Sequence, residues 1–192
     1  MLILPYLCTH KHCKNMKRIL ILDGSPKKNG KTASLKKAFI EGAKQNGHEV
    51  MDLYLHKMNI KGCLACDACK LGKVARCVQR DDMDIIFDEF IKADVVVFTS
   101  PMMWGTVSAQ LRLGTDRFYA FCWNPAWQGV FKAKQMVLMM TAGADGQMPE
   151  EQLYSVPLHW YGIFEYLGMK SIGTVLGTGK EEEARSLGMS IE

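Results

Sequence analysis

The sequence predicts a doubly wound α/β fold, in which helices cover both faces of a five-stranded parallel sheet. Five short runs rich in β-branched residues, leucine and methionine alternate with stretches whose apolar residues recur at helical spacing. Polar loops containing glycine follow several of these runs, as expected where buried parallel strands end. With 192 residues, 48% of them hydrophobic and 23% charged, the chain has the size and composition of a single globular domain.

The first half of the chain supplies three of the predicted strands, at 17–23, 48–55 and 94–100. The helix after the first strand has its apolar positions on one face: Leu35, Ala38, Phe39, Gly42 and Ala43. A second helix is expected to begin near Met83, where Asp81 or Asp82 can act as its N-cap.

The second half predicts a helix from about Ser108, a strand at 135–141, a helix at 149–167 kinked by Pro157, and a strand at 169–176. Right-handed crossovers between successive strands give the sheet order 2-1-3-4-5, which is that of flavodoxin. Residues 16–192 are therefore expected to form one flavodoxin-like domain.

The first fifteen residues do not continue this pattern. Their apolar run has no basic region before it and no small-residue cleavage site after it, which argues against a secretory signal. We expect 1–15 to be a disordered leader, with the natural start at Met16. No run is long enough to span a membrane, and a net charge of +4 is too small to indicate a nucleic-acid partner. The density of thiols indicates the cytoplasm.

The loop after the first strand is predicted to bind a phosphate group. It reads GSPKKNGKT over residues 24–32 and leads into a helix, so that backbone N–H groups and the positive end of the helix dipole point into it. Five residues separate its glycines, where a nucleotide-binding P-loop has four, and the run lacks the G-x-G-x-x-G pattern. We therefore expect a single terminal phosphate, such as that of FMN. The predicted contacts are Ser25, Lys27, Asn29, Gly30, Lys31 and Thr32.

Two further loops are expected to flank a flat ring of the ligand, because ligands of such sheets bind beyond the carboxyl ends of the strands. The third strand ends in a loop with a large aromatic side chain, and the fourth ends in a loop that contains glycine. The candidate ring contacts are Pro101, Met102, Met103, Trp104, Gly105, Thr106, Ala142 and Gly143. The loop after the second strand is expected nearby.

That loop, residues 62–80, is rich in cysteine and predicts a metal or redox site. Its thiols follow the spacing C-x2-C-x2-C-x7-C, which suits a 4Fe–4S cluster held by four thiolates. The expected ligands are Cys63, Cys66, Cys69 and Cys77. Zinc, which usually takes two separated ligand pairs, and redox thiols that form disulfides remain as alternatives.

Several segments in this order resemble the NADPH-dependent FMN reductase superfamily: GSPKKNG at 24–30, DDM at 81–83 after the cysteines, and the stretch from SP at 100–101 to DR at 116–117. The compact cysteine motif resembles the iron-sulfur flavoproteins of anaerobic archaea and bacteria. The likeness extends from about residue 16 to residue 176.

The resemblance implies a redox protein that binds FMN and one 4Fe–4S cluster and assembles as a homodimer or homotetramer. It suggests NAD(P)H as a reductant, a ferredoxin-like electron carrier as a partner, and a small-molecule acceptor. The flavin and the cluster would carry the chemistry, so no catalytic side chain is expected. A cluster-free NAD(P)H-dependent FMN or quinone reductase is the main alternative. A protein with structural zinc and an empty crevice is another.

Three further features of the sequence allow more than one interpretation. The aromatic segment 118–127 is compatible with a subunit contact, a flavin wall or buried core. Cys122 and His159 lie among apolar and aromatic residues, and we interpret both as core residues rather than catalytic groups.

Overall fold

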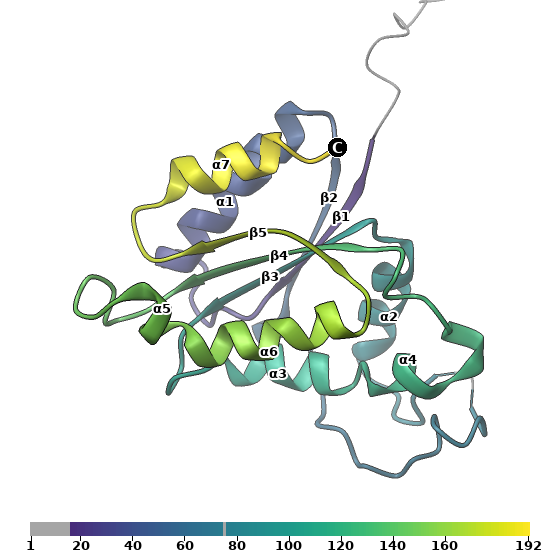
Figure 1. Cartoon of the computed structure of the whole chain (residues 1–192). Coiled ribbons are helices and arrows are strands. Elements are labelled where there is room, and N and C mark those ends of the chain that lie inside the picture. Colours follow the sequence, from purple (N-terminus) through teal and green to yellow (C-terminus); the bar gives the residue numbers. More distant parts are fainter. Residues whose placement is uncertain (1–15, 75) are drawn as a thin grey trace, which may run out of the picture.

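The computed structural model describes residues 16–74 and 76–192. In this part of the chain a five-stranded parallel sheet, in the order β2-β1-β3-β4-β5, lies between two layers of helices (Figure 1). The predicted fold and strand order are confirmed. The expected leader at 1–15 lies outside the described residues.

All five predicted strands form, with bounds that differ from the expected ones by two residues or fewer. They are β1 (Arg18–Asp23), β2 (Glu49–Tyr54), β3 (Val95–Pro101), β4 (Gln135–Thr141) and β5 (Lys170–Leu176). β1, β3 and β4 are almost wholly buried because helices cover both of their faces, which explains their nearly continuous apolar sequences. β2, at one edge of the sheet, keeps a mixed pattern of exposed and half-buried residues.

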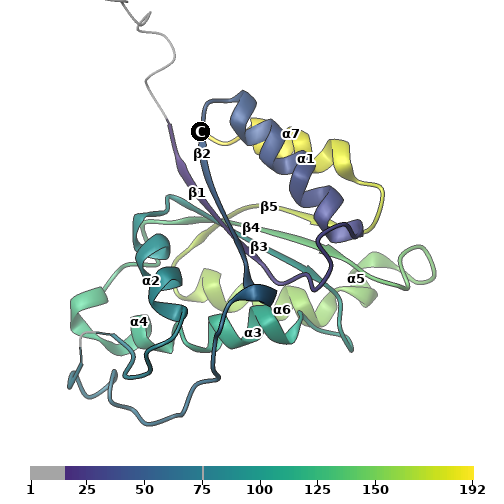
Figure 2. The same cartoon turned by 180° about the vertical axis from the view of Figure 1, so that it is seen from behind.

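The described helices divide between the two faces of the sheet (Figures 1 and 2). Helices α1 (Lys31–Gln45) and α7 (Glu181–Met189) cover one face. The other face carries α2 (Met83–Lys92), α3 (Ala109–Asp116), α4 (Tyr119–Trp123) and α6 (Ser155–Tyr166). Three short elements complete the set: the 3-10 turns η1 (Leu55–Lys57) and η2 (Pro125–Trp127), and α5 (Glu150–Leu153).

Glycines allow α1 and α7 to pack closely. A Cβ atom at Gly188 would overlap the backbone carbonyl of Phe39 in α1, and one at Gly42 would overlap the backbone carbonyl of Arg185 in α7. Since an overlap with backbone cannot be relieved by a side-chain rotation, these positions require glycine. α7 was not predicted from the sequence.

One predicted helix is corrected, and for another the structure distinguishes between the two candidate capping residues. The expected helix at 149–167 is two helices, α5 and α6, separated at Tyr154. Pro157 lies in the first turn of α6, where its missing N–H would have no helical partner, so proline is tolerated there. At the start of α2 the N–H of Met83 donates to Oδ1 of Asp81 at 3.2 Å, whereas Asp82 accepts from the N–H of Asn59.

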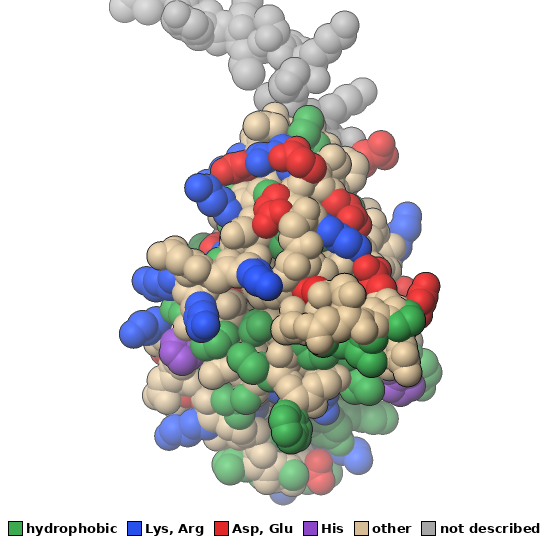
Figure 3. All heavy atoms as spheres, turned by 90° about the vertical axis from the view of Figure 1, so that its left-hand side faces the viewer, with side chains coloured by type: hydrophobic (Ala, Val, Ile, Leu, Met, Phe, Trp, Pro, Cys, Tyr) green, Lys and Arg blue, Asp and Glu red, His purple; other side chains and the backbone are tan. Residues whose placement is uncertain are grey.

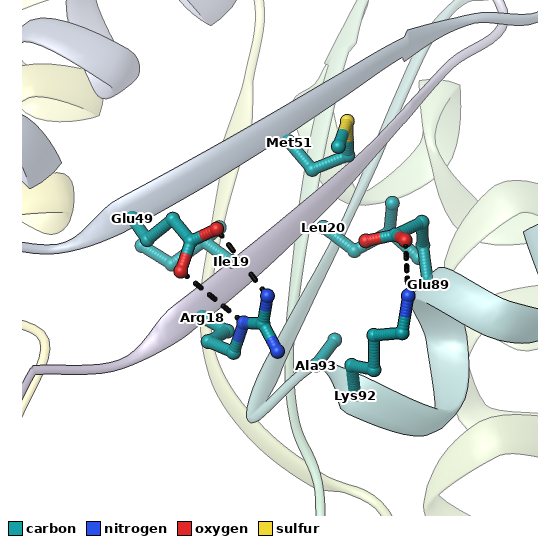
Figure 4. Close-up of a pocket in the computed structure, with 8 residues that line it drawn as sticks. All are labelled: Arg18, Ile19, Leu20, Glu49, Met51, Glu89, Lys92 and Ala93. Carbon is teal, nitrogen blue, oxygen red and sulfur yellow. Dashed lines mark hydrogen bonds and ion pairs between the residues drawn. The ribbon is translucent and has the colours of Figure 1, made fainter.

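A hollow among the described residues near the amino ends of β1 and β2 is too small for a cofactor. Figure 4 shows a hollow there beside the ion pairs Arg18–Glu49 and Lys92–Glu89, and its volume is about 10 Å³. Such a space accommodates about one water molecule. None of the described helices combines the length and the apolar character needed to cross a membrane.

Candidate flavin site and cysteine-rich loop

A crevice of about 400 Å³ opens at the carboxyl ends of β1, β3 and β4, within the range of small-molecule sites. It is lined by Ser25, Pro26, Lys27, Asn29, Gly30, Lys31, Thr32, Pro101, Met102, Met103, Thr141, Ala142 and Gly143. The structure thus brings together every predicted flavin contact except Trp104, Gly105 and Thr106, and adds Pro26 and Thr141. Figure 3 views this side of the molecule, where apolar side chains gather below the middle and basic side chains lie along one flank.

A buried carboxylate holds the start of the phosphate loop. Asp23 is 1% exposed, and its Oδ1 accepts hydrogen bonds from the N–H of Ser25 at 2.9 Å and from the hydroxyl of Thr99 at 3.1 Å. Its Oδ2 pairs with the ammonium of Lys36, which also reaches Asp52, at 2.7 Å each. Burial lowers the pKa of Lys36, but the hydrogen bonds to both carboxylates outweigh it, so the pKa is raised. This network was not predicted from the sequence.

The amino end of α1 is open toward the crevice. Its N-cap, Gly30, provides no side-chain hydrogen bond, and the first turn carries no acidic residue that would repel an anion. The hydroxyls of Thr32 and Thr141 are 2.7 Å apart, and both residues are buried. The helix end therefore has the chemistry of a phosphate site, and the adjoining volume and apolar lining fit FMN.

The loop after β3 contains a tight turn at the edge of the crevice. Met103 and Thr106 exchange backbone hydrogen bonds of 2.8 and 3.1 Å, with Trp104 and Gly105 at the tip. Both tip residues have positive φ, 53° and 79°, and this conformation is costly for a bulky residue such as tryptophan. Trp104 is fully exposed and is not among the residues that line the crevice, and its contact with a flavin ring stays a prediction.

The loop after β4 is held by two part-buried hydrogen bonds to Asp145. Asp145 accepts from the N–H of Ala142 at 3.0 Å and from the hydroxyl of Tyr154 at 2.5 Å. Burial and the neighbouring carboxylate raise the pKa of Tyr154, so this hydroxyl stays a neutral donor. Neither residue was singled out from the sequence, because Asp145 lies in a loop and Tyr154 is nine residues further along the chain.

The cysteine-rich loop does not lie beside the crevice, contrary to the expectation. It leaves the sheet after η1 and runs along α3 and α4 (Figures 1 and 2), and none of its described residues lines the crevice. The side-chain amide of Asn124 donates to the carbonyl of Val74 at 2.8 Å. Lys70 and Arg76 lie over the rings of Trp123 and Trp127. The aromatic segment 118–127 thus contacts the cysteine-rich loop of the same chain.

The four thiols of the loop differ in environment. Cys63 and Cys66 are exposed, whereas Cys69 and Cys77 are partly buried against the core. Burial raises the pKa of Cys69, and nearby Cys77 and Cys63 add to this effect. Within residues 16–74 and 76–192, no three or more histidine, cysteine or acidic side chains are gathered as a metal site. The donor set has the chemistry that a cluster needs, but its sulfurs are not collected at one point.

Two side chains interpreted as core differ in the structure. Cys122 is partly buried, packs against the core and donates to the carbonyl of Phe118 at 3.6 Å, which agrees with the interpretation. His159 is exposed on α6, so its interpretation as a core residue is wrong.

Comparisons with known proteins agree with this architecture. A family model for the flavodoxin-like fold matches residues 17–188. An iron-sulfur flavoprotein of Archaeoglobus fulgidus is 29% identical over 85% of this chain and 69% of its own length. An iron-sulfur flavoprotein of Methanosarcina thermophila is 32% identical over 52% of this chain. This chain spans only about half the length of the other iron-sulfur flavoproteins that it matches.

Among solved structures, an NAD(P)H:quinone oxidoreductase from Methanothermobacter marburgensis superposes with a TM-score of 0.69 and 20% identity, over 93% of this chain and 97% of that one. At this identity the likeness supports the fold alone. The sheet order and the family match over 17–188 lead to the same conclusion. The chain belongs to the family of proteins with the flavodoxin-like fold.

Proposed function

We propose that this protein is an FMN-dependent oxidoreductase in which the flavin exchanges electrons with a 4Fe–4S cluster. The observation that carries the flavin part is the crevice at the carboxyl ends of β1, β3 and β4. Bound FMN would supply hydride acceptance and one-electron transfer. The open end of α1, with Ser25 and Thr32, would bind the phosphate, and Pro101, Met102 and Gly143 would flank the ring and limit access of water.

The proposed ligands of the cluster are Cys63, Cys66, Cys69 and Cys77. Their support is the spacing of the thiols, their common loop, and the names of the iron-sulfur flavoprotein relatives. Closing four sulfurs around a cluster would require the loop to rearrange, because no three of these thiols are gathered as a metal site among the described residues. Ala65 and Asp67, on either side of Cys66, have φ of 49° and 54°, an unfavourable backbone conformation that such a rearrangement could relieve.

The position of the cysteine-rich loop bears on the partners. Since the crevice and the loop have no lining residue in common, electron exchange would be completed by a second copy in a homodimer or homotetramer, or by a carrier. Trp104 is exposed beside the crevice and is suited to a contact with a second copy of the chain. Lys70 and Lys73 are exposed on the loop and are suited to a contact with an acidic carrier. We propose NAD(P)H or an acidic ferredoxin-like protein as reductant, a small molecule as acceptor, and the cytoplasm as location.

The test is purification without oxygen, followed by the visible spectrum and assays of iron, acid-labile sulfide and FMN per chain. We expect about four irons and four sulfides beside one FMN. Cys66→Ala should lose the iron and keep the flavin. Cys122→Ala removes a thiol outside the motif and should keep both. Iron retained in full by Cys66→Ala, or no iron in the wild type, would refute the cluster.

A cluster-free NAD(P)H-dependent FMN or quinone reductase is the second candidate. Among the described residues the cysteines are not gathered as a metal site, which favours it. It predicts flavin without iron, and oxidation of NADPH coupled to quinone reduction at an equal rate in wild type and Cys66→Ala.

A further inference from the structure

A buried arginine at the end of α3 joins the two ends of the cysteine-rich loop. Nη1 of Arg117 donates to the carbonyl of Lys61 at 2.8 Å, just before the loop, and to Oδ2 of Asp81 at 2.9 Å, just after it. Nη2 donates to Oδ1 of Asp81 at 3.2 Å, so the carboxylate is held by both nitrogens. The side chains of Arg117 and Asp81 are 1% and 0% exposed.

The carboxylate of Asp81 binds backbone groups as well. It accepts hydrogen bonds from the N–H of Lys61 at 3.0 Å and from the N–H of Met83 at 3.2 Å. Arg117, Asp81 and the backbone at both ends of the loop thus form one buried network. Without the guanidinium, the carbonyl of Lys61 would lose its partner and the carboxylate would keep only its backbone donors.

One donor of this arginine is not used by the network. Its Nε–H is buried and has no hydrogen-bond acceptor among the described residues. The thiol of Cys77 also interacts electrostatically with this guanidinium. A buried unpartnered donor is uncommon, and one beside a thiol that is expected to bind metal has a natural acceptor in that thiolate.

We propose that Arg117 is the positioning residue of the cysteine-rich loop: it holds the ends of the loop together and supplies its Nε–H as a hydrogen-bond donor to the Cys77 thiolate. The second half of this inference rests on the proposed 4Fe–4S cluster. Hydrogen bonds to the ligating sulfurs raise the reduction potential of such a cluster, because they stabilise its more negative, reduced form. Arg117 would therefore set the potential of the cluster without contacting iron.

The test uses Arg117→Lys and Arg117→Gln of the full chain, with Arg112→Lys and Arg112→Gln as controls. Arg112 lies on the same helix and forms an exposed ion pair with Asp116. Circular dichroism and FMN titration identify the variants that fold. Lysine keeps the positive charge and a bond to Asp81 but has no Nε–H, and it serves as the second variant if the glutamine variant does not fold.

The first measurement, on iron-free protein, is hydrogen–deuterium exchange of the amides of Lys61 and Met83. We expect exchange to be roughly tenfold faster or more in Arg117→Gln, intermediate in Arg117→Lys, and unchanged in the Arg112 variants. Exchange at the wild-type rate in a folded Arg117 variant would overturn the proposal that Arg117 holds the ends of the loop together.

The second measurement, after reconstitution with ferrous iron and sulfide, is the midpoint potential of the cluster by redox titration followed by electron paramagnetic resonance. We expect a more negative potential in Arg117→Lys, a larger shift in Arg117→Gln, and none in the Arg112 variants. Loaded clusters with equal potentials would overturn the donor role. Absence of iron from the wild type would instead refute the proposed cluster. The exchange data would still show whether Arg117 holds the ends of the loop together.

Discussion

Asp23→Asn is the most informative perturbation of the flavin site. Asparagine has the shape of aspartate, so its oxygen can still accept from the N–H of Ser25 and the hydroxyl of Thr99. The atom that replaces Oδ2 is an NH2 group, which meets the ammonium of Lys36 donor to donor. The substitution therefore removes the charge from the carboxylate that holds the phosphate loop and leaves the packing nearly unchanged.

The magnitude follows from the burial of the pair. The side chains of Asp23 and Lys36 are 2% and 14% exposed, and a charge-assisted hydrogen bond of this kind contributes about 1.5–3 kcal/mol. Lys36 keeps Asp52 as a partner, so we expect a loss of about 2 kcal/mol in the free energy of unfolding. The neutral amide oxygen is a weaker acceptor for the N–H of Ser25 than the carboxylate, so the phosphate loop is held less firmly and FMN binding should weaken roughly tenfold, or by about 1.4 kcal/mol.

The matched control is Asp52→Asn, which removes the other carboxylate from Lys36 but does not contact the phosphate loop. Its side chain is 33% exposed, so we expect a loss of less than about 1 kcal/mol and less than a threefold change in FMN affinity. Urea unfolding followed by circular dichroism gives the stabilities, and quenching of FMN fluorescence gives the affinities. Equal losses of affinity in the two variants would refute a positioning role for Asp23.

Three further predictions concern other parts of the fold. Burial lowers the pKa of Lys134 from 10.5 to about 8, so the unfolded chain binds more protons between these values. Wild-type stability should therefore rise by up to about 3 kcal/mol from pH 8 to pH 10.5 relative to Lys134→Met, and parallel pH curves would contradict this. Gly188→Ala forces a methyl group against the carbonyl of Phe39 and should lower the free energy of unfolding by about 2 kcal/mol; an unchanged urea midpoint would show that the helices can separate freely. Thr32→Val removes the hydroxyl that pairs with Thr141 and should weaken FMN binding roughly tenfold at unchanged secondary structure, whereas wild-type affinity would exclude Thr32 as a phosphate contact.

β1, β3 and β4 could be predicted from the sequence because each is a short, largely apolar run bounded by polar residues, and helices on both faces bury it almost wholly. α7 was missed for a physical reason. Its burial depends on Gly42 and Gly188, which lie 146 positions apart and permit close contact only when the two helices pack. The periodicity of apolar residues within one segment does not reveal a contact between residues so far apart in the sequence.

The same distinction applies to the flavin site. The phosphate loop and the two loops beside it were predicted because each follows a strand end, and the topology of the sheet brings strand ends together. The residues that hold these loops were not. Lys36 is an ordinary polar residue of a surface helix until the fold places Asp23 and Asp52 within 2.7 Å of its ammonium. The position of the cysteine-rich loop likewise depends on Arg117, far away in the sequence.

Helix α3 connects the two candidate sites. At its amino end, the N-cap Ser108 donates its N–H to Ser100 of β3, and a Cβ atom on Gly24 of the phosphate loop would overlap its hydroxyl. At its carboxyl end, Arg117 holds the base of the cysteine-rich loop. Eight helical residues at 1.5 Å each make α3 a spacer of about 12 Å. Because a short, partly buried helix moves as a unit, a shift of the loop after β3 on flavin binding would reach Arg117, and exchange at Lys61 should therefore slow when FMN binds.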